Sequence, residues 1–197
     1  MNKQLLDLYS DYLISSFGQT TATGLSQLTR GEISHDETTR FLSSERATGA
    51  HLWQYVKSFV RQVERADGVL IIDDSIEEKP HTDENEIICW HWDHSKQRNV
   101  KGINFVSALY HSQESSIPVG YELVAKTEHY IDEKTGQAKR RSPVTKNEYA
   151  RQLIQQAVEN RILFAYVLAD IWFASAENMR FIKDELKKEF IFAIKEN

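Results

Sequence analysis

Hydrophobic residues in this chain of 197 residues repeat with a helical period up to about residue 65 and in strand-like patterns after it. In the first part, apolar positions recur every three or four residues, which is the period of an amphipathic helix. Ser34 and Glu37 have the spacing of a capping box and mark the start of one such helix. The predicted helices cover residues 3–17, 21–28, 35–42 and 52–63. The pattern therefore predicts a small helical bundle over residues 1–65.

After residue 65 the apolar residues form short runs and alternating stretches that are typical of β-strands, with two helical stretches between them. Strands are predicted over residues 68–73, 87–93, 100–110, 119–126, 163–170 and 190–194, and helices over residues 149–160 and 175–188. A meander of strands followed by alternating helices and strands predicts a mixed sheet flanked by helices. Residues 66–197 are therefore expected to form an α/β domain.

In two of the predicted strands an uninterrupted apolar run leads directly into an aspartate. The apolar run Val69–Ile72 leads into Asp73, and the run over residues 163–169 leads into Asp170. In α/β sheets, ligands bind beyond the carboxyl ends of the strands, so the two acids would meet if their strands are neighbours. Carboxylates gathered there suit a divalent cation, which relieves their mutual repulsion. An aspartate in this position is also a common turn former or helix N-cap, and the pattern alone leaves that interpretation open.

The composition excludes several classes of protein. A hydrophobic fraction of 41% and a charged fraction of 27% are ordinary for a soluble globular chain. Cys89 is the single cysteine, which excludes an internal disulfide and predicts a reducing, cytoplasmic location. The sequence has no apolar run of membrane-spanning length, so no membrane partner is expected. The net charge of −5 argues against a surface that binds nucleic acid all over and leaves local basic patches for that role.

Local basic and polar clusters are the candidate DNA contacts. The helix after the capping box follows a tight turn, as in a helix-turn-helix module, although six bases balance six acids in residues 1–62. A second cluster lies in a stretch that Gly136 and Pro143 mark as a loop, which is either solvated or in contact with phosphates. The candidates are Thr38, Thr39 and Arg40 in the helix, Lys96, Arg98 and Lys101 around a predicted turn, and Lys139, Arg140 and Arg141 in the loop.

Cys89, His91 and His94 are spaced closely enough to suggest a zinc site. However, no second pair of ligands follows at the spacing of such a site. Histidines beside tryptophans are also more often packed or surface residues than metal ligands. We therefore prefer a structural interpretation of these three residues over a metal site.

Five segments carry a more specific signal: DYLISSFGQTTATGLSQLT, SHDETTRFLS, IIDDSIEEKPHTDENEIICWHWDHSKQRNVKGIN, VLADIWFASAENMRFIK and FIFAIKEN. They resemble bacterial insertion-sequence transposases of the DDE type, which cut and paste DNA and belong to the ribonuclease H-like superfamily. The resemblance extends over nearly the whole chain. In that family the first catalytic aspartate follows a hydrophobic strand and precedes a small residue and a hydroxyl residue, and Asp73 matches it, with Asp74 and Ser75 after it. The second catalytic aspartate matches Asp170.

This resemblance implies a fold, an activity and a set of partners. Residues 1–65 would form a helical domain that recognises terminal inverted repeats in double-stranded DNA. Residues 66–197 would form a ribonuclease H-like domain that cuts and rejoins DNA. Asp73 and Asp170 would be its catalytic residues and would bind two Mg²⁺ or Mn²⁺ ions. The protein would act in the bacterial cytoplasm at the nucleoid, as a homodimer or together with a full-length transposase.

The chain departs from the family at its end. The family's third carboxylate is a glutamate on a helix beyond the fifth strand, after a β-rich insertion, and this sequence stops at that strand. The ribonuclease H-like domain is therefore expected to be incomplete and C-terminally truncated, with an apolar face and an open sheet edge. We expect it to hold a second cation weakly and to show little or no strand transfer.

Two alternatives to an active transposase stay open. In the first, the chain is a non-catalytic DNA-binding fragment that regulates a full-length transposase. In the second, it is a metal-dependent nuclease that is complete at this length. That nuclease would need a third acid near Asp73 and Asp170, and the candidates are Asp74 and Glu177.

Overall fold

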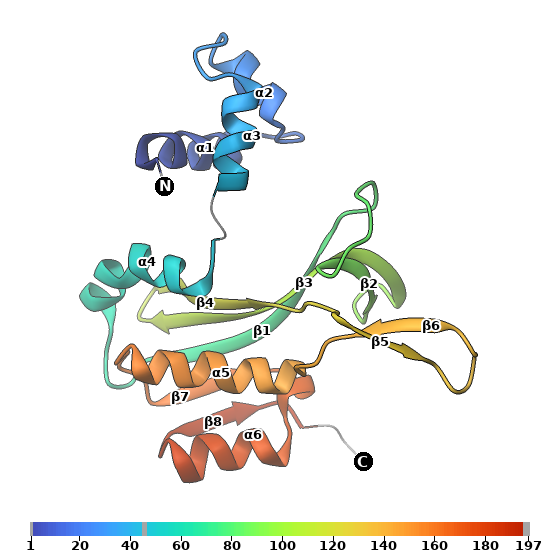
Figure 1. The fold of residues 1–197 in the computed structure, drawn as a ribbon. Coiled ribbons are helices and arrows are strands. Elements are labelled where there is room, and N and C mark those ends of the chain that lie inside the picture. The colour runs from blue at the N-terminus through green and yellow to red at the C-terminus, as the bar shows by residue number, and fades with distance from the viewer. Residues whose placement is uncertain (1, 45–46, 195–197) are drawn as a thin grey trace. The chain divides into compact units, whose positions relative to one another are not determined.

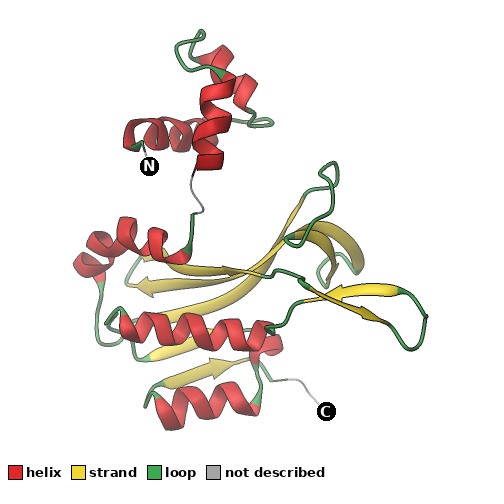
Figure 2. Ribbon diagram, in the orientation of Figure 1, coloured by secondary structure: helices red, strands yellow, loops and turns green. Residues whose placement is uncertain are grey.

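The computed structural model describes residues 2–44 and 47–194. Its contacts divide the chain into two compact units, Met1–Ala47 and Thr48–Asn197. Figure 1 and Figure 2 show helices alone in the first unit and a sheet with helices in the second. Within the described ranges, no helix combines the length and the apolarity that a membrane span requires.

The first unit consists of the helices α1 (Lys3–Ser15), α2 (Ala22–Leu28) and α3 (His35–Ser44). Tyr12 joins α1 to the start of α2, because its hydroxyl accepts a hydrogen bond from the Thr21 amide and donates one to the Thr21 carbonyl. Ser34 caps α3 by accepting the Glu37 amide at 3.1 Å, as the capping-box spacing predicts. The three helices predicted for this part of the chain are therefore confirmed.

The second unit has six strands in its main sheet within the described residues. These strands are β1 (Val69–Glu78), β2 (Ile88–Asp93), β3 (Arg98–Ser112), β4 (Ser115–Leu123), β7 (Tyr166–Ala169) and β8 (Glu189–Phe192). Its helices are α4 (Gly49–Val63), α5 (Lys146–Glu159) and α6 (Ala176–Arg180), with the short 3-10 helix η1 (Ile171–Phe173) and the short π-helix η2 (Phe181–Glu185). A separate hairpin consists of β5 (Glu128–Ile131) and β6 (Ala138–Arg141). The predicted α/β class is confirmed.

The strands follow the order β2-β3-β1-β7-β8, and β4 pairs with β3. β1 runs antiparallel to β3 and parallel to β7, and β7 runs parallel to β8. The sheet is therefore mixed, and the two aspartate-bearing strands are neighbours. The order differs from a simple meander, because β2 and β4 pair with successive parts of the long strand β3, and β1 pairs with β3 rather than with β2.

β1 does not end at its aspartates, contrary to the prediction. It continues to Glu78, because it pairs with β3 as far as Gly102. β7 is shorter and pairs only with Val69–Ile72 of β1. Asp73 therefore lies in the middle of its own strand, at the point where the neighbouring strand stops.

One face of the sheet carries the core of this unit. Leu70 and Ile72 of β1 are buried in the same cluster as Leu153 and Ile154 of α5. Figure 1 shows α5 and α6 lying along the sheet on this side. On the opposite face, Ile191 of β8 is 56% exposed. The described residues therefore leave part of that second face in contact with solvent.

α4 packs with the second unit. Its buried residues Trp53 and Val60 belong to the same core cluster as β1 and α5. The compact units consequently divide between Ala47 and Thr48, whereas the sequence predicts a boundary between residues 65 and 66. The periodicity predicts the helix but not the surface against which it packs.

Candidate metal centre

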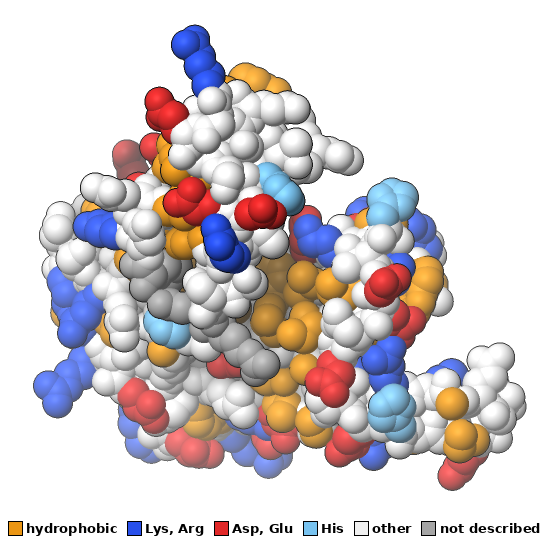
Figure 3. Space-filling view, turned by 45° about the horizontal axis from the view of Figure 1, so that its top comes forward, with side chains coloured by type: hydrophobic (Ala, Val, Ile, Leu, Met, Phe, Trp, Pro, Cys, Tyr) orange, Lys and Arg blue, Asp and Glu red, His pale blue; other side chains and the backbone are white. Residues whose placement is uncertain are grey.

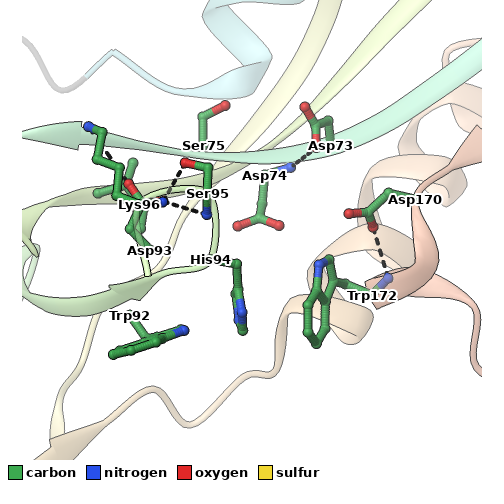
Figure 4. Close-up of a pocket in the computed structure, with 11 residues that line it drawn as sticks. Asp73, Asp74, Ser75, Trp92, Asp93, His94, Ser95, Lys96, Asp170 and Trp172 are labelled. Carbon is green, nitrogen blue, oxygen red and sulfur yellow. Dashed lines mark hydrogen bonds and ion pairs between the residues drawn. The ribbon is translucent and has the colours of Figure 1, made fainter. Parts of the chain in front are cut away.

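The parallel pairing of β1 and β7 brings Asp73 and Asp170 next to each other. Ile72 pairs with Ala169 at the end of this ladder, and each aspartate is the next residue of its strand. Both aspartates line one cavity of about 430 Å³ (Figure 4). The structure therefore brings together the two residues that the sequence predicts as metal ligands.

Each of these carboxylates is held by one backbone amide. Asp73 Oδ1 accepts the amide N–H of Asp74 at 2.8 Å, and Asp170 Oδ1 accepts that of Trp172 at 3.0 Å. The second bond makes Asp170 the N-cap of η1, so this residue both caps a turn and lines the cavity. Among the described residues, the other oxygen of each carboxylate has no protein donor. Those oxygens are free to coordinate a cation.

The pKa of the Asp73 carboxyl is raised above its usual value. Partial desolvation is the largest cause, and the negative charges of Asp74 and Asp170 add to it. The Asp74 amide and the Lys146 ammonium lower the pKa without cancelling the rise. A divalent cation would favour the charged carboxylate and relieve this repulsion.

Asp74 also lines the cavity, but it has a partner. Strand alternation directs its side chain to the other side of β1 from that of Asp73, as Figure 4 shows. Its carboxylate forms an ion pair with Lys146 Nζ at 2.5 Å. Lys146 is the first residue of α5, whose start is fixed by a capping box at Thr145. Asp74 is therefore already neutralised by a cation of the protein.

Glu177, the other candidate for a third acid, lies elsewhere. It pairs with Arg151 at 3.1 Å and lines a different cavity, beside α5 and α6. In the part of the chain that the structure describes, no three His, Cys, Asp or Glu side chains group closely enough to hold a metal ion by themselves. The oxygens of Asp73 and Asp170 fit Mg²⁺ or Mn²⁺ in kind, because these ions prefer hard oxygen ligands. The two carboxylates alone, however, fill only part of the coordination shell of such an ion.

The turn between β2 and β3 reaches the same cavity. Asp93 shapes this turn, because its Oδ1 accepts the amides of Ser95 at 2.9 Å and Lys96 at 3.1 Å. The Ser95 hydroxyl also donates to Asp93, and together with the Lys96 amide it lowers the pKa of that carboxyl. The Asp93 carboxylate therefore serves to stabilise the β2–β3 turn.

Three further residues lie at the site although the sequence does not place them beside the two aspartates. His94 and Trp172 line the cavity, and Lys146 pairs with one of its acids. These residues come from the β2–β3 turn, η1 and the start of α5, which are far apart in the chain. A contact between such distant segments depends on the sheet topology, which local patterns do not specify.

The three residues with zinc-like spacing do not gather at one point. Cys89 Sγ lies 3.3 Å from His91 Nε2, and both side chains are buried. Burial raises the pKa of the Cys89 thiol and lowers that of His91 to about 4. His94 instead stacks on Trp172 in the cavity lined by Asp73, Asp74 and Asp170, which we call the acidic cavity. The Cys89–His91 contact is therefore part of the packing around β2.

The candidate DNA contacts of the first unit differ in exposure. Thr38 is fully buried, and its hydroxyl donates to the Ser34 carbonyl at 3.2 Å. Its role in this structure is to pack and anchor α3. Thr39 and Arg40 are exposed on the same helix and are available to a ligand.

The candidate contacts around β2 and β3 are partly neutralised. Lys96 and Arg98 both pair with Glu78 of β1, and Arg98 does so at 3.2 Å. Lys101 lies on β3 opposite Trp90 and is half-buried. Of these bases, Lys96 is the one that lines the acidic cavity.

The predicted basic loop is the β5–β6 hairpin, and each of the three candidate DNA contacts in it pairs with an acid. The pairs are Lys139 with Asp132, Arg140 with Glu84, and Arg141 with Glu128. Figure 3 likewise shows Lys and Arg side chains interspersed with Asp and Glu on the face in view. A DNA phosphate would have to compete with these acids for the bases.

Comparisons with known proteins bear on the chain as a whole. The profile of the family described as DDE superfamily endonuclease matches residues 2–197. No curated protein matches the chain. Among solved structures, it is similar to the Drosophila P element transposase strand transfer complex, with 11% identity and a TM-score of 0.42. That match covers 93% of this chain and 36% of the other, so the chain spans about a third of its length.

Proposed function

The chain belongs to the DDE superfamily endonuclease family, and from this premise we propose that it is a DNA transposase whose sheet carries a metal-dependent centre for strand cleavage and strand transfer. The observation that supports this most is the adjacency of Asp73 and Asp170 at the end of the β1–β7 ladder. Two acids from strands that are far apart in sequence line one cavity there, and the pKa of Asp73 is raised partly by Asp170. Functional acids commonly show such a shift.

Asp73 and Asp170 are the residues that would hold Mg²⁺ or Mn²⁺. Such a cation activates the attacking oxygen and stabilises the leaving oxygen in phosphoryl transfer. The protein's own contribution is positioning. The Asp74 amide fixes the Asp73 carboxylate and the Trp172 amide fixes that of Asp170, while the other oxygen of each accepts no hydrogen bond from the described residues. Preorganised ligands of this kind lower the cost of orienting the reacting groups.

Lys146 has a separate role in this proposal. By pairing with Asp74 it removes one negative charge from the cavity, and its ammonium favours the charged form of Asp73. A cavity in which all the acids were unpaired would repel a DNA phosphate more strongly. We therefore assign Lys146 to the positioning and neutralisation of Asp74.

Double-stranded DNA is the proposed substrate, with terminal inverted repeats as the specific sequence. The exposed residues Thr39 and Arg40 of α3 are the proposed contacts of the first unit, in the manner of a recognition helix. Lys96 of the acidic cavity is the proposed contact of the second unit. A homodimer, or a complex with a longer transposase, would bring two DNA ends together.

A second candidate function has an observation in its favour. Within the described residues no three potential ligands form a ready metal site, which favours a DNA-binding fragment that regulates a full-length transposase. For the same reason we expect strand transfer by this chain alone to be weak. The two functions differ in whether DNA binding depends on a cation at Asp73 and Asp170.

Gel shifts with DNA from the ends of the element that encodes the chain separate these functions. A transposase centre predicts tighter binding in Mn²⁺ than in EDTA, and Asp73→Asn or Asp170→Asn should remove that increment. Any Mn²⁺-dependent nicking should disappear in the same variants. Glu177→Gln is the matched control, because this acid lines another cavity and should leave the increment intact. Equal binding in Mn²⁺ and EDTA for all four proteins would instead support the regulatory fragment.

A further inference from the structure

Three aromatic rings lie in a row beside the aspartates. The His94 imidazole stacks on the Trp172 indole, with ring centroids 4.1 Å apart and an angle of 29° between the planes. The Trp92 ring meets His94 edge-on, with centroids 6.4 Å apart and an angle of 80°. Figure 4 shows the three rings on the side of the cavity toward which Asp74 points. We call Trp92, His94 and Trp172 the aromatic row.

The aromatic row is exposed although large aromatic residues are usually well buried. Trp92 is 50% exposed and Trp172 is 57% exposed. Neither belongs to the hydrophobic core cluster of this unit. Single exposed apolar residues need no explanation, but rings from two distant segments that stack on each other form a contiguous patch, and such patches mark binding sites.

Trp172 is also tied to a proposed metal ligand. Its backbone amide donates to Asp170 Oδ1 at 3.0 Å, and Asp170 caps the turn η1 that contains Trp172. The turn therefore sets where the indole lies relative to the carboxylate. A group that stacks on this indole would therefore lie at a set position relative to a phosphate bound through Asp170.

From this arrangement we infer that the aromatic row is a stacking site for an unpaired nucleobase next to the phosphate that is cleaved. The inference rests on the proposed function, because it takes the ligand of the acidic cavity to be DNA. Every base has a flat face that stacks on aromatic side chains whatever its sequence. A base inside a duplex already stacks on its neighbours, so only an unpaired base can reach the aromatic row.

The other residues of the cavity select a nucleotide over an apolar ligand. Asp73, Asp74 and Asp170 line it together with the aromatic row. An apolar peptide side chain would cover these carboxylates without replacing their bonds to water, which is costly. A nucleotide offers a base to the rings and a phosphate to a cation held by the acids. The volume of about 430 Å³ also lies in the range of roughly 300–1,000 Å³ that small ligands occupy.

The test measures how tightly the full chain binds a short single-stranded DNA oligonucleotide that carries a fluorescent purine analogue. Anisotropy gives the affinity, and quenching of the analogue reports stacking on an indole. Trp172→Ala and His94→Ala should each weaken binding about tenfold, a typical effect of losing one base–aromatic stack, and should reduce the quenching. Trp172→Phe keeps a flat ring and should retain most of the affinity.

Trp90→Ala is the matched control. Trp90 is 54% exposed on the same strand as Trp92 but lines a different cavity, so its loss should change the affinity by less than about twofold. Thermal melts show that each variant is folded, which is expected because the altered rings are outside the core. Wild-type affinity in Trp172→Ala, or an equal loss in Trp90→Ala, would overturn the stacking site.

Failure of the proposed function gives a different result. In that case Asp73→Asn leaves binding of duplex ends in Mn²⁺ unchanged, while Trp172→Ala still weakens binding of the single strand in EDTA. If instead Asp73→Asn removes the Mn²⁺ increment and Trp172→Ala binds the single strand as wild type does, the metal centre stands and the stacking site is refuted.

Discussion

Among single residues, Asp73 has an ionised side chain that folding disfavours: its charged form costs more free energy in the folded chain than in the unfolded chain. Its pKa is raised by partial desolvation and by the charges of Asp74 and Asp170. The folded chain therefore holds this proton more tightly than the unfolded chain. As a result, stability falls as the pH rises from the usual carboxyl value of 3.8 to the higher folded value, and above that window the cost is fully present.

Asp73→Asn is accordingly expected to stabilise the second unit at neutral pH. The gain should be about 0.5 kcal/mol or less, because solvent screens an exposed carboxylate. It should vanish below pH 3.8, where the carboxyl is protonated in both states. Thermal melts at acidic and neutral pH measure this difference.

Asp67→Asn is the control for that experiment. The Asp67 carboxyl has a lowered pKa because Arg65 donates a hydrogen bond to it, so the substitution should not stabilise the fold. A loss of stability in Asp73→Asn at neutral pH would contradict the repulsion assigned to this residue. Stabilisation by removal of a charged group is typical of a site whose charge serves a ligand rather than the fold.

Among the secondary-structure elements, α5 positions the side chain of Lys146 next to β1. Thr145 caps the helix, and Lys146 at its first position reaches Asp74 of β1. The Asp74 side chain is only 19% exposed, so its charge depends on this partner more than a surface acid would.

Lys146→Met is therefore expected to destabilise the second unit by about 1 kcal/mol, because it leaves Asp74 without a cation. Lys183→Met is the matched control, since Lys183 pairs with Glu189 at 2.6 Å but both side chains are more than half exposed. Its cost should stay below about 0.5 kcal/mol. Urea denaturation measures the free energy of unfolding of both variants.

The double variant Lys146→Met with Asp74→Asn should recover most of the stability that Lys146→Met loses, because no unpaired charge remains. Equal losses of stability in Lys146→Met and Lys183→Met would refute a special role for Lys146.

The elements themselves could largely be predicted, whereas their ends and partners could not. The capping box at Ser34 and the alternation in β3 gave correct types, because caps and periodicity are local. Asp73 was predicted at the end of a strand because polar residues begin there. The strand continues because β3 supplies hydrogen bonds as far as Glu78, and that pairing is not a local property.

At the scale of the whole molecule, the division into units follows packing rather than periodicity. The sequence predicts that α4 belongs with the N-terminal helices, but Trp53 and Val60 are buried in the core beneath the sheet. A fragment that begins at Thr48 keeps these residues, and one that begins at residue 66 lacks them.

The fragment 48–197 is therefore expected to unfold cooperatively in urea. The fragment 66–197 should be less stable by several kcal/mol, since loss of one large buried side chain typically costs about 2–5 kcal/mol. Far-UV circular dichroism during denaturation compares the two. Equal midpoints would show that α4 is not part of this core and would support the boundary predicted from periodicity.

The residues around the acidic cavity could likewise be predicted from the sequence only in part. Asp73 and Asp170 could be predicted because each directly follows an uninterrupted apolar run, a pattern that occurs twice in the chain. The aromatic row and Lys146 could not, since three segments meet there only after the β2–β3 turn, η1 and α5 take their places around the sheet. A single residue at a contact between distant segments does not belong to a periodic sequence pattern, so its neighbours cannot be predicted from such a pattern.

Mn²⁺ binding to the full chain shows whether Asp73 and Asp170 share a divalent cation, as we propose. Electron paramagnetic resonance of the free ion gives the bound amount. We predict that the wild-type chain binds one Mn²⁺ ion. Asp73→Asn and Asp170→Asn should each lose this ion, and the double variant should lose no more than either single variant. Glu177→Gln should still bind it. Undiminished Mn²⁺ binding in either single aspartate variant would contradict a shared site.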